Sequence, residues 1–102
     1  MNKKNFATDI LKELAWTSEN ETVTFDEGVF KVVVNEIVDT SRWSNIYDLV
    51  FEWQGSFYRT SYSVGATEMQ DEQPFEYADA EVECFEVAPK VISKTIYEPI
   101  EA

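Results

Sequence analysis

The stretch that decides the fold is residues 43–64, WSNIYDLVFEWQGSFYRTSYSV. In its first half, large apolar side chains recur at every second position, which is the period of a β-strand with one apolar face. These side chains are Tyr47, Leu49, Phe51 and Trp53. Gly55 interrupts the alternation, and a second aromatic run follows it. The stretch therefore predicts two antiparallel strands, residues 43–53 and 57–64, joined by a tight turn.

The turn is predicted at Gly55-Ser56, because glycine in the first position is typical of a type II′ hairpin. This register places Glu52 opposite Arg59, an opposite-charge pair worth ~0.2–1 kcal/mol. The alternative loop, Gln54-Gly55, would shift the pairing by two residues and remove that pair. We therefore expect the first register.

On the N-terminal side of this hairpin, the pattern predicts one helix and a second hairpin. A helix is expected over residues 5–16 with Asn5 as its N-cap, because apolar side chains follow the spacing of one helical face. They are Phe6, Ile10, Leu11 and Leu14. Residues 22–25 and 29–38 are expected to be strands joined by a turn at Gly28, which can adopt a positive φ.

On the C-terminal side, residues 65–79 lack a clear period and are predicted to be a long loop. Residues 80–87 and 90–97 are predicted to be a last pair of strands, because Pro89 and Pro99 bound the second of them. The expected fold is α+β, with one N-terminal helix packed on an antiparallel sheet of five or six strands built from consecutive hairpins. An open sheet and a small barrel both fit the pattern.

Composition indicates one soluble domain covering residues 1–102. The chain is 44% hydrophobic and 15% aromatic, which is enough for one core. Its single cysteine, Cys84, excludes an intrachain disulfide and favours a reduced, cytoplasmic setting. Residues 1–16 do not have the pattern of a signal peptide, and no apolar run is long enough to span a membrane.

The residue types that perform most enzyme chemistry are scarce. The chain has no histidine, so His-dependent triads and most zinc sites are excluded. Cys84 lies between Glu83 and Phe85, and nearby carboxylates disfavour a reactive thiolate. We expect no enzyme activity, no cofactor and no metal site. Two alternatives stay open: a pair of catalytic carboxylates, and an irregular calcium site in residues 68–79.

The most unusual feature is an acidic run at residues 68–86, EMQDEQPFEYADAEVECFE, within a chain of net charge −12. Between Thr60 and Pro89 the chain has no basic residue. One interpretation is a solvated loop and strand that serve solubility. The other is a surface that docks on a basic protein, because aromatic residues are interleaved with the acids and are enriched in interfaces. The predicted partner-binding residues are Glu68, Asp71, Glu72, Phe75, Glu76, Tyr77, Asp79, Glu81 and Glu83.

Charge spacing limits the docking hypothesis. Eight acids on nineteen extended residues give one charge per ~8 Å, whereas each DNA strand carries one per ~3.4 Å. The run can imitate a nucleic acid only if the loop folds back beside other acids, such as Asp48 and Glu52. Phe75 and Tyr77 are predicted either to anchor the partner or to fix the loop to the core.

The segment 47–72, YDLVFEWQGSFYRTSYSVGATEMQDE, together with the strand EVECFEV and the proline-bounded segment after it, resembles small acidic accessory proteins of bacterial viruses. The resemblance covers about residues 47–98. It implies an inhibitor of host defence, such as an anti-CRISPR or anti-restriction protein, that acts in the host cytoplasm. Such a protein would occupy the basic groove of a host nucleic-acid-binding enzyme, as a monomer or small homo-oligomer, without binding nucleic acid or membrane itself. The alternative is a phage structural or assembly protein that self-associates through sheet edges, for instance at residues 90–97.

Overall fold

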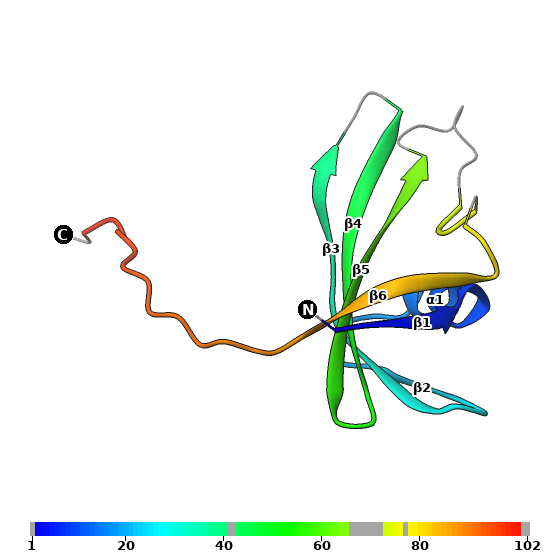
Figure 1. Ribbon diagram of the computed structural model, residues 1–102. Helices are drawn as coiled ribbons and strands as arrows, with labels where there is room; N and C mark the ends of the chain where they lie inside the picture. The colour runs from blue at the N-terminus through cyan, green and yellow to red at the C-terminus, as the bar shows by residue number, and fades with distance from the viewer. Residues whose placement is uncertain (1, 41–42, 66–72, 77, 101–102) are drawn as a thin grey trace.

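The computed structural model describes residues 2–40, 43–65, 73–76 and 78–100. Over these residues the fold is α+β, with one short helix and a curled six-stranded antiparallel sheet (Figure 1). The elements in chain order are β1 (Lys3–Ala7), α1 (Thr8–Ala15), β2 (Thr22–Phe25), β3 (Gly28–Thr40), β4 (Ser44–Trp53), β5 (Ser56–Gly65) and β6 (Glu81–Val87).

The sheet has the order β1-β6-β5-β4-β3-β2, so β1 and β2 are its two edge strands. Strands β2 to β5 form a meander, because each pairs with the next along the chain. The pair β1–β6 crosses this meander steeply, which gives the sheet its curl (Figure 1). The hairpin predicted from residues 22–25 and 29–38 is confirmed, although its second strand runs from Gly28 to Thr40. Gly28, at a φ of 128°, pairs with Phe25 next to the Asp26-Glu27 turn.

The predicted hairpin of β4 and β5 is present, but its predicted register is wrong by two residues. Trp53 is opposite Ser56, and Glu52 is opposite Phe57. The loop is Gln54-Gly55, whose φ angles are 51° and 79°. Two positive φ angles are typical of a type I′ turn, whose twist matches that of the strands. Turn geometry therefore outweighs the single charge pair on which the prediction depended.

A helix is expected over residues 5–16, but the helix in the structure begins three residues later, at Thr8. Residues 3–7 form β1, which pairs antiparallel with β6, and α1 starts at Thr8. The N-cap position is held by Ala7 rather than Asn5. Phe6 is buried, and its ring lies edge-on to Phe51, at 5.0 Å between ring centroids. Pairing with a distant strand therefore overrides the local helical period at this end.

The predicted strand at residues 90–97 is also wrong. Residues 88–100 form neither helix nor strand and project from the body in Figure 1. The predicted pairing with residues 80–87 needs a free side of β6. However, β5 and β1 occupy both sides of that strand. The sixth strand comes instead from the start of the chain.

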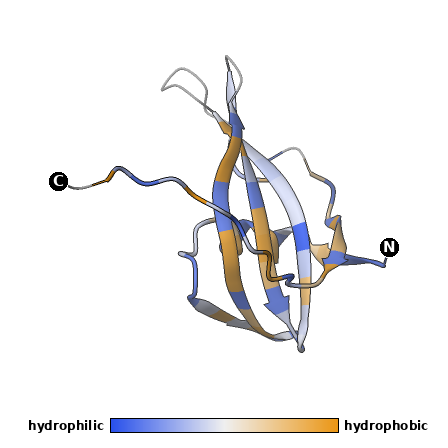
Figure 2. Cartoon of the chain, turned by 90° about the vertical axis from the view of Figure 1, so that its left-hand side faces the viewer, coloured by the Kyte–Doolittle hydropathy of each residue, from blue (hydrophilic) through white to orange (hydrophobic). Residues whose placement is uncertain are grey.

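The buried core includes apolar side chains of the strands and of α1. Figure 2 shows hydrophobic and hydrophilic positions alternating along the long strands. Phe30, Phe51 and Leu49 are fully buried, as are Leu11 and Leu14 from α1. Asn35 joins three elements, because its amide donates to the Ala15 carbonyl at 3.1 Å and accepts from the Tyr62 hydroxyl at 2.6 Å.

Among the described residues, no helix combines the length and the hydropathy that crossing a membrane requires.

Candidate functional site

The acidic run is only partly within the described residues. Glu68, Asp71, Glu72 and Tyr77 lie outside them. The structure places the other predicted site residues: Phe75, Glu76, Asp79, Glu81 and Glu83. We call the four carboxylates of this set, Glu76, Asp79, Glu81 and Glu83, the acidic surface.

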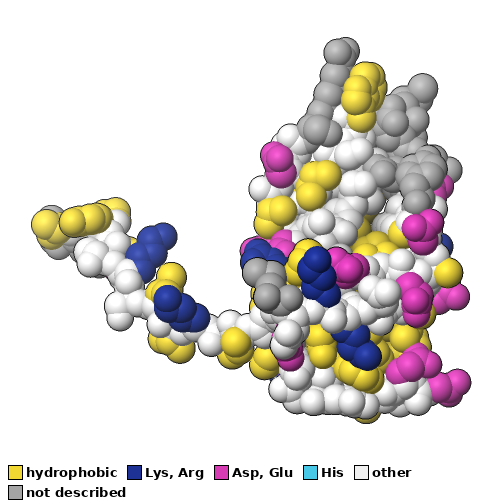
Figure 3. All heavy atoms as spheres, viewed as in Figure 1, with side chains coloured by type: hydrophobic (Ala, Val, Ile, Leu, Met, Phe, Trp, Pro, Cys, Tyr) yellow, Lys and Arg dark blue, Asp and Glu magenta, His cyan; other side chains and the backbone are white. Residues whose placement is uncertain are grey.

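All four side chains of the acidic surface are exposed. Glu81 and Glu83 alternate along β6, so both project from the same side of the strand, opposite Ala7 and Asn5 of β1. Glu76 and Asp79 lie in the segment that leads into β6. In the view of Figure 3, acidic side chains gather on the right-hand part of the body. The described part of the predicted site is therefore available to a partner.

A nearby cation reduces the charge of this surface at one point. Lys3 Nζ lies 3.4 Å from Glu83 Oε1, and both side chains are about half exposed, at 51% and 52%. Exposed pairs of this kind contribute ~0–1 kcal/mol, because water screens them. The ammonium of Lys3 also lies 5.5 Å from the centroid of the Phe85 ring. Glu83 is thus the member of the acidic surface whose charge is most nearly balanced.

The sheet does not add Asp48 to the acidic surface. Its carboxylate is only 11% exposed and accepts two hydrogen bonds from Arg59, at 2.8 Å to Oδ1 and 2.7 Å to Oδ2. Glu52 lies opposite Lys31 in the β3–β4 ladder. Asp48 therefore does not meet the condition that a nucleic-acid mimic requires, additional free acids on neighbouring strands.

Phe75 is a core residue, with only 8% of its surface exposed. The centroid of its ring lies 5.2 Å from the centroid of the Tyr62 ring, and its backbone φ is 57°. The turn around it is closed by the bond from Glu76 N to Gln73 O, 3.1 Å. Of the two roles considered for Phe75, this position fits the one in which the ring fixes the loop to the core.

The chain between Phe75 and β6 is attached to the start of α1. Thr8 donates from its hydroxyl to the Asp79 carbonyl and from its backbone nitrogen to the Ala80 carbonyl, the latter at 2.9 Å. These bonds satisfy part of the backbone at the helix start, where no side-chain cap is present. Asp79 and Glu81 are consequently held by backbone contacts rather than by their own side chains.

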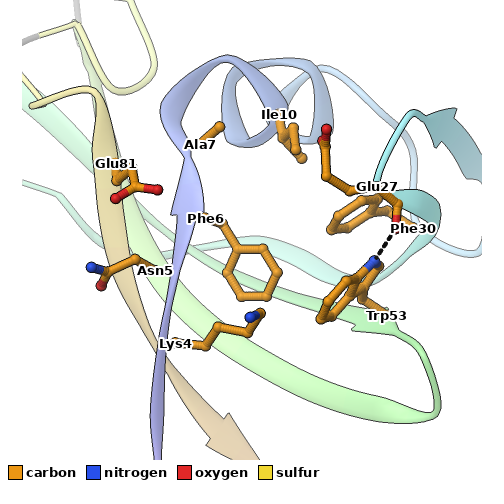
Figure 4. Close-up of a pocket in the computed structure, with 9 residues that line it drawn as sticks. All are labelled: Lys4, Asn5, Phe6, Ala7, Ile10, Glu27, Phe30, Trp53 and Glu81. Carbon is orange, nitrogen blue, oxygen red and sulfur yellow. Dashed lines mark hydrogen bonds between the residues drawn. The ribbon is translucent and has the colours of Figure 1, made fainter.

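Beside the acidic surface lies an aromatic hollow that the sequence did not predict. It has a volume of about 320 Å³ and is bordered by Phe6, Phe30 and Trp53, with Glu27 and Glu81 at its rim (Figure 4). Trp53 donates from Nε1 to the Glu27 carbonyl at 3.0 Å, which holds the indole in place. Lys4 Nζ lies 5.1 Å from the Trp53 ring centroid. Period-two alternation in the sequence does not distinguish a filled interior from one that opens at an edge.

The remaining candidate for chemistry within the described residues is Cys84. Cys84 is fully buried, and burial raises the pKa of its thiol to about 11, so the thiol is protonated near neutral pH. Among the residues that the structure describes, no three His, Cys, Asp or Glu side chains are grouped as a metal site would require.

Comparison with family models, with curated proteins and with solved structures finds no match to this chain. Inferences about function therefore depend on the site itself.

Proposed function

We propose that this protein is a non-enzymatic binding protein whose acidic surface docks on a basic surface of another protein. The observation that carries the proposal is the exposure of Glu76, Asp79, Glu81 and Glu83 on the side where β6 begins. Unlike Asp48, none of these four is held by an arginine in the described contacts. Exposed carboxylates attract and orient a basic partner.

The partner class we propose is a nucleic-acid-binding enzyme of a host cell, whose basic groove the acidic surface would occupy. The chain's net charge of −12 opposes direct binding to nucleic acid and favours a basic protein groove. The narrower form of the proposal is an inhibitor of a host defence nuclease, of anti-CRISPR or anti-restriction type, as the resemblance to phage accessory proteins implies.

The proposed contact is a local charge cluster rather than a full copy of a nucleic-acid backbone. Asp48 is neutralised by Arg59, and Glu83 is partly balanced by Lys3. The strongest docking charges would therefore be Glu76, Asp79 and Glu81. Association driven in this way is fast and weakens as salt concentration rises, because exposed charges are screened over ~10 Å at 0.1 M.

The test is inhibition of DNA cleavage by a panel of purified RNA-guided and restriction nucleases. A variant with Glu76→Gln, Asp79→Asn, Glu81→Gln and Glu83→Gln removes the acidic surface with little change of shape. A matched control carries Glu13→Gln, Asp26→Asn, Glu21→Gln and Glu36→Gln, four exposed acids elsewhere on the chain. Both variants change the net charge equally, so their difference isolates the position of the charge.

We expect the unmodified protein and the control to inhibit at least one nuclease, and the acidic-surface variant to lose at least ~10-fold in potency, about 1.4 kcal/mol. Inhibition should also weaken with added salt. Equal potency of the two variants would remove the acidic surface from the mechanism. If no nuclease of the panel is inhibited, the proposed partner class is wrong.

A second candidate function, assembly with further copies of the chain, is favoured by one observation. Residues 88–100 carry large apolar side chains in full contact with water, among them Val91 at 97% and Tyr97 at 95% exposure. Monomeric soluble proteins rarely leave several such side chains together without a partner.

A further inference from the structure

The aromatic hollow runs along the open edge of β1. Four consecutive residues of the strand border it: Lys4, Asn5, Phe6 and Ala7. Since alternate side chains of a strand point to opposite faces, a hollow that touches all four must lie beside the strand rather than over one face. β1 is an edge strand, and within the described part of the chain no strand pairs with its outer side. The outer edge of β1 therefore combines backbone donors and acceptors with an apolar hollow. Sites where a peptide adds a strand to a sheet have the same combination.

The same chain carries a segment suited to such a site. Residues 90–97, KVISKTIY, are described, exposed and in no strand. If the segment is extended, one side carries Ile92, Lys94 and Ile96 and the other carries Val91, Ser93, Thr95 and Tyr97. At ~3.3 Å per residue its eight residues span ~26 Å, more than the five residues of β1 require. An apolar side chain from this segment is of a size that the hollow of about 320 Å³ accepts.

Charge also matches the segment to the hollow. Residues 90–97 contain Lys90 and Lys94 and no acid. The residues that line the hollow include two acids, Glu27 and Glu81, and one cation, Lys4. Glu81 belongs to β6 and lies opposite Ala7, on the paired side of β1 (Figure 4). Hydrophobic and basic side chains are visible on the projecting segment in Figure 3. The segment therefore complements the rim in both polarity and sign.

A second copy of the chain is a better source for this segment than the same copy. β6 ends at Val87, beside the start of β1, and the chain then leads away from the body (Figure 1). To reach the hollow, a copy's own segment would reverse, cross β1 and run parallel to it. The segment of a second copy is free to pair antiparallel, which is the more stable arrangement. Reciprocal exchange between two copies gives a closed dimer with two identical contacts.

We propose that residues 90–97 of one copy add as an antiparallel strand to the open edge of β1 in a second copy, with Ile92 or Ile96 entering the aromatic hollow. This contact gives the assembly function a specific surface. It does not depend on docking of the acidic surface to a nuclease, and its test measures association of the chain with itself, without a nuclease.

The test is sedimentation equilibrium of the full chain over a range of concentrations. We expect a monomer–dimer equilibrium. The variant with Ile92→Asp and Ile96→Asp should raise the dissociation constant by ~100-fold or more, because it puts a charge in place of the isoleucine that enters the hollow, whichever of the two this is. The control with Ser93→Asp and Thr95→Asp adds the same charge on the opposite side of the segment. It should dimerise much more strongly than the variant with the two isoleucines replaced. All four side chains are exposed, so none of these substitutions disturbs the fold of the body.

Amide hydrogen exchange then locates the contact. Protection of residues 90–97 and of β1 should rise together as concentration increases. A chain that is monomeric at every concentration would overturn the inference, as would a dimer that both variants weaken equally or that neither weakens. Protection of residues 90–97 that does not depend on concentration would mean that the segment folds back on its own copy, which would overturn it as well.

Discussion

Arg59 and Asp48 form a two-pronged ion pair although they are not opposite each other in the sheet. Arg59 lies opposite Val50, whereas Asp48 lies opposite Ser61. The guanidinium reaches diagonally to the carboxylate with bonds of 2.8 Å and 2.7 Å. The hydrogen bonds and the charge of Asp48 raise the pKa of Arg59. The carboxylate is the more buried partner of the pair, at 11% exposure against 57%.

Because the two partners differ in burial, mutation of Arg59 and mutation of Asp48 should lower the free energy of unfolding by different amounts. Arg59→Gln leaves a buried carboxylate without its charge partner and should lower the free energy of unfolding by about 2–3 kcal/mol. Asp48→Asn leaves an exposed guanidinium that water solvates, and should cost about 1 kcal/mol. Urea unfolding of the two variants and the double variant checks this. Equal costs for the single variants would contradict the assigned difference in burial.

Phe75 should matter for folding stability. Phe75→Ala removes a ring that contacts Tyr62, and should lower the free energy of unfolding by about 2–4 kcal/mol, since the loss of a buried aromatic leaves a cavity. Phe75→Leu retains most of the apolar volume and serves as the control. Thermal unfolding followed by circular dichroism measures both. A fully stable Phe75→Ala protein would instead favour the role of Phe75 as a partner anchor.

The turn between β4 and β5 offers a gain in stability. Gln54 has a φ of 51°, which asparagine and glycine adopt at lower cost. Gln54→Asn should therefore raise the free energy of unfolding by roughly 0.5 kcal/mol. Gly55→Ala should lower it by about 1–2 kcal/mol through backbone strain alone, because a methyl group at Gly55 would meet no atom within 4 Å. If Gln54→Asn is destabilising in urea unfolding, the type I′ assignment is wrong.

Alkaline pH should destabilise the protein through two buried acids. Burial raises the pKa of Cys84 from 9.0 to about 11, and that of Tyr62 from 10.0 to about 12. Both groups are neutral when protonated, and the unfolded chain loses these protons first. The stability that they contribute is therefore complete below pH 9 and declines as pH rises from 9 to 12.

The measurement is the urea midpoint as a function of pH. Cys84→Ala lowers the midpoint at every pH because it leaves a cavity, but it should flatten the decline between pH 9 and 10, where the cysteine alone contributes. A midpoint that stays constant over the whole alkaline range would show that neither group is protected by burial.

Local patterns in the sequence predicted the strands that pair with their neighbours along the chain. The alternation at Leu49 and Phe51 and the turn at Gly28 are sufficient for the meander of β2 to β5. The register at Gln54-Gly55 differs from the predicted one, because backbone twist outweighs a single charge pair. Pairings between distant parts of the chain leave no comparable local pattern.

Phe6 illustrates what local patterns lack. Its spacing from Ile10 and Leu14 fits a helix, yet the residue belongs to a strand whose partner lies nearly eighty positions later, at Val82. The same pairing removes the predicted partner of residues 90–97. For the candidate site, charge composition identified Glu81 and Glu83 as exposed acids. The aromatic hollow beside them could not be predicted in this way, because it forms only when the curl of the sheet brings β1 next to Trp53.

The β1–β6 pairing also affects the order in which the chain can fold during synthesis. The meander of β2 to β5 pairs locally, so it can form as soon as residue 65 has left the ribosome. Residues 3–7 emerge first but gain their strand partner only when residues 81–87 appear. Until then Phe6 has no fixed position against Phe51 and Tyr58, and the nascent protein exposes the aromatic interior of an unfinished sheet. The time for which this interior stays open is therefore set by the time needed to translate the acidic run.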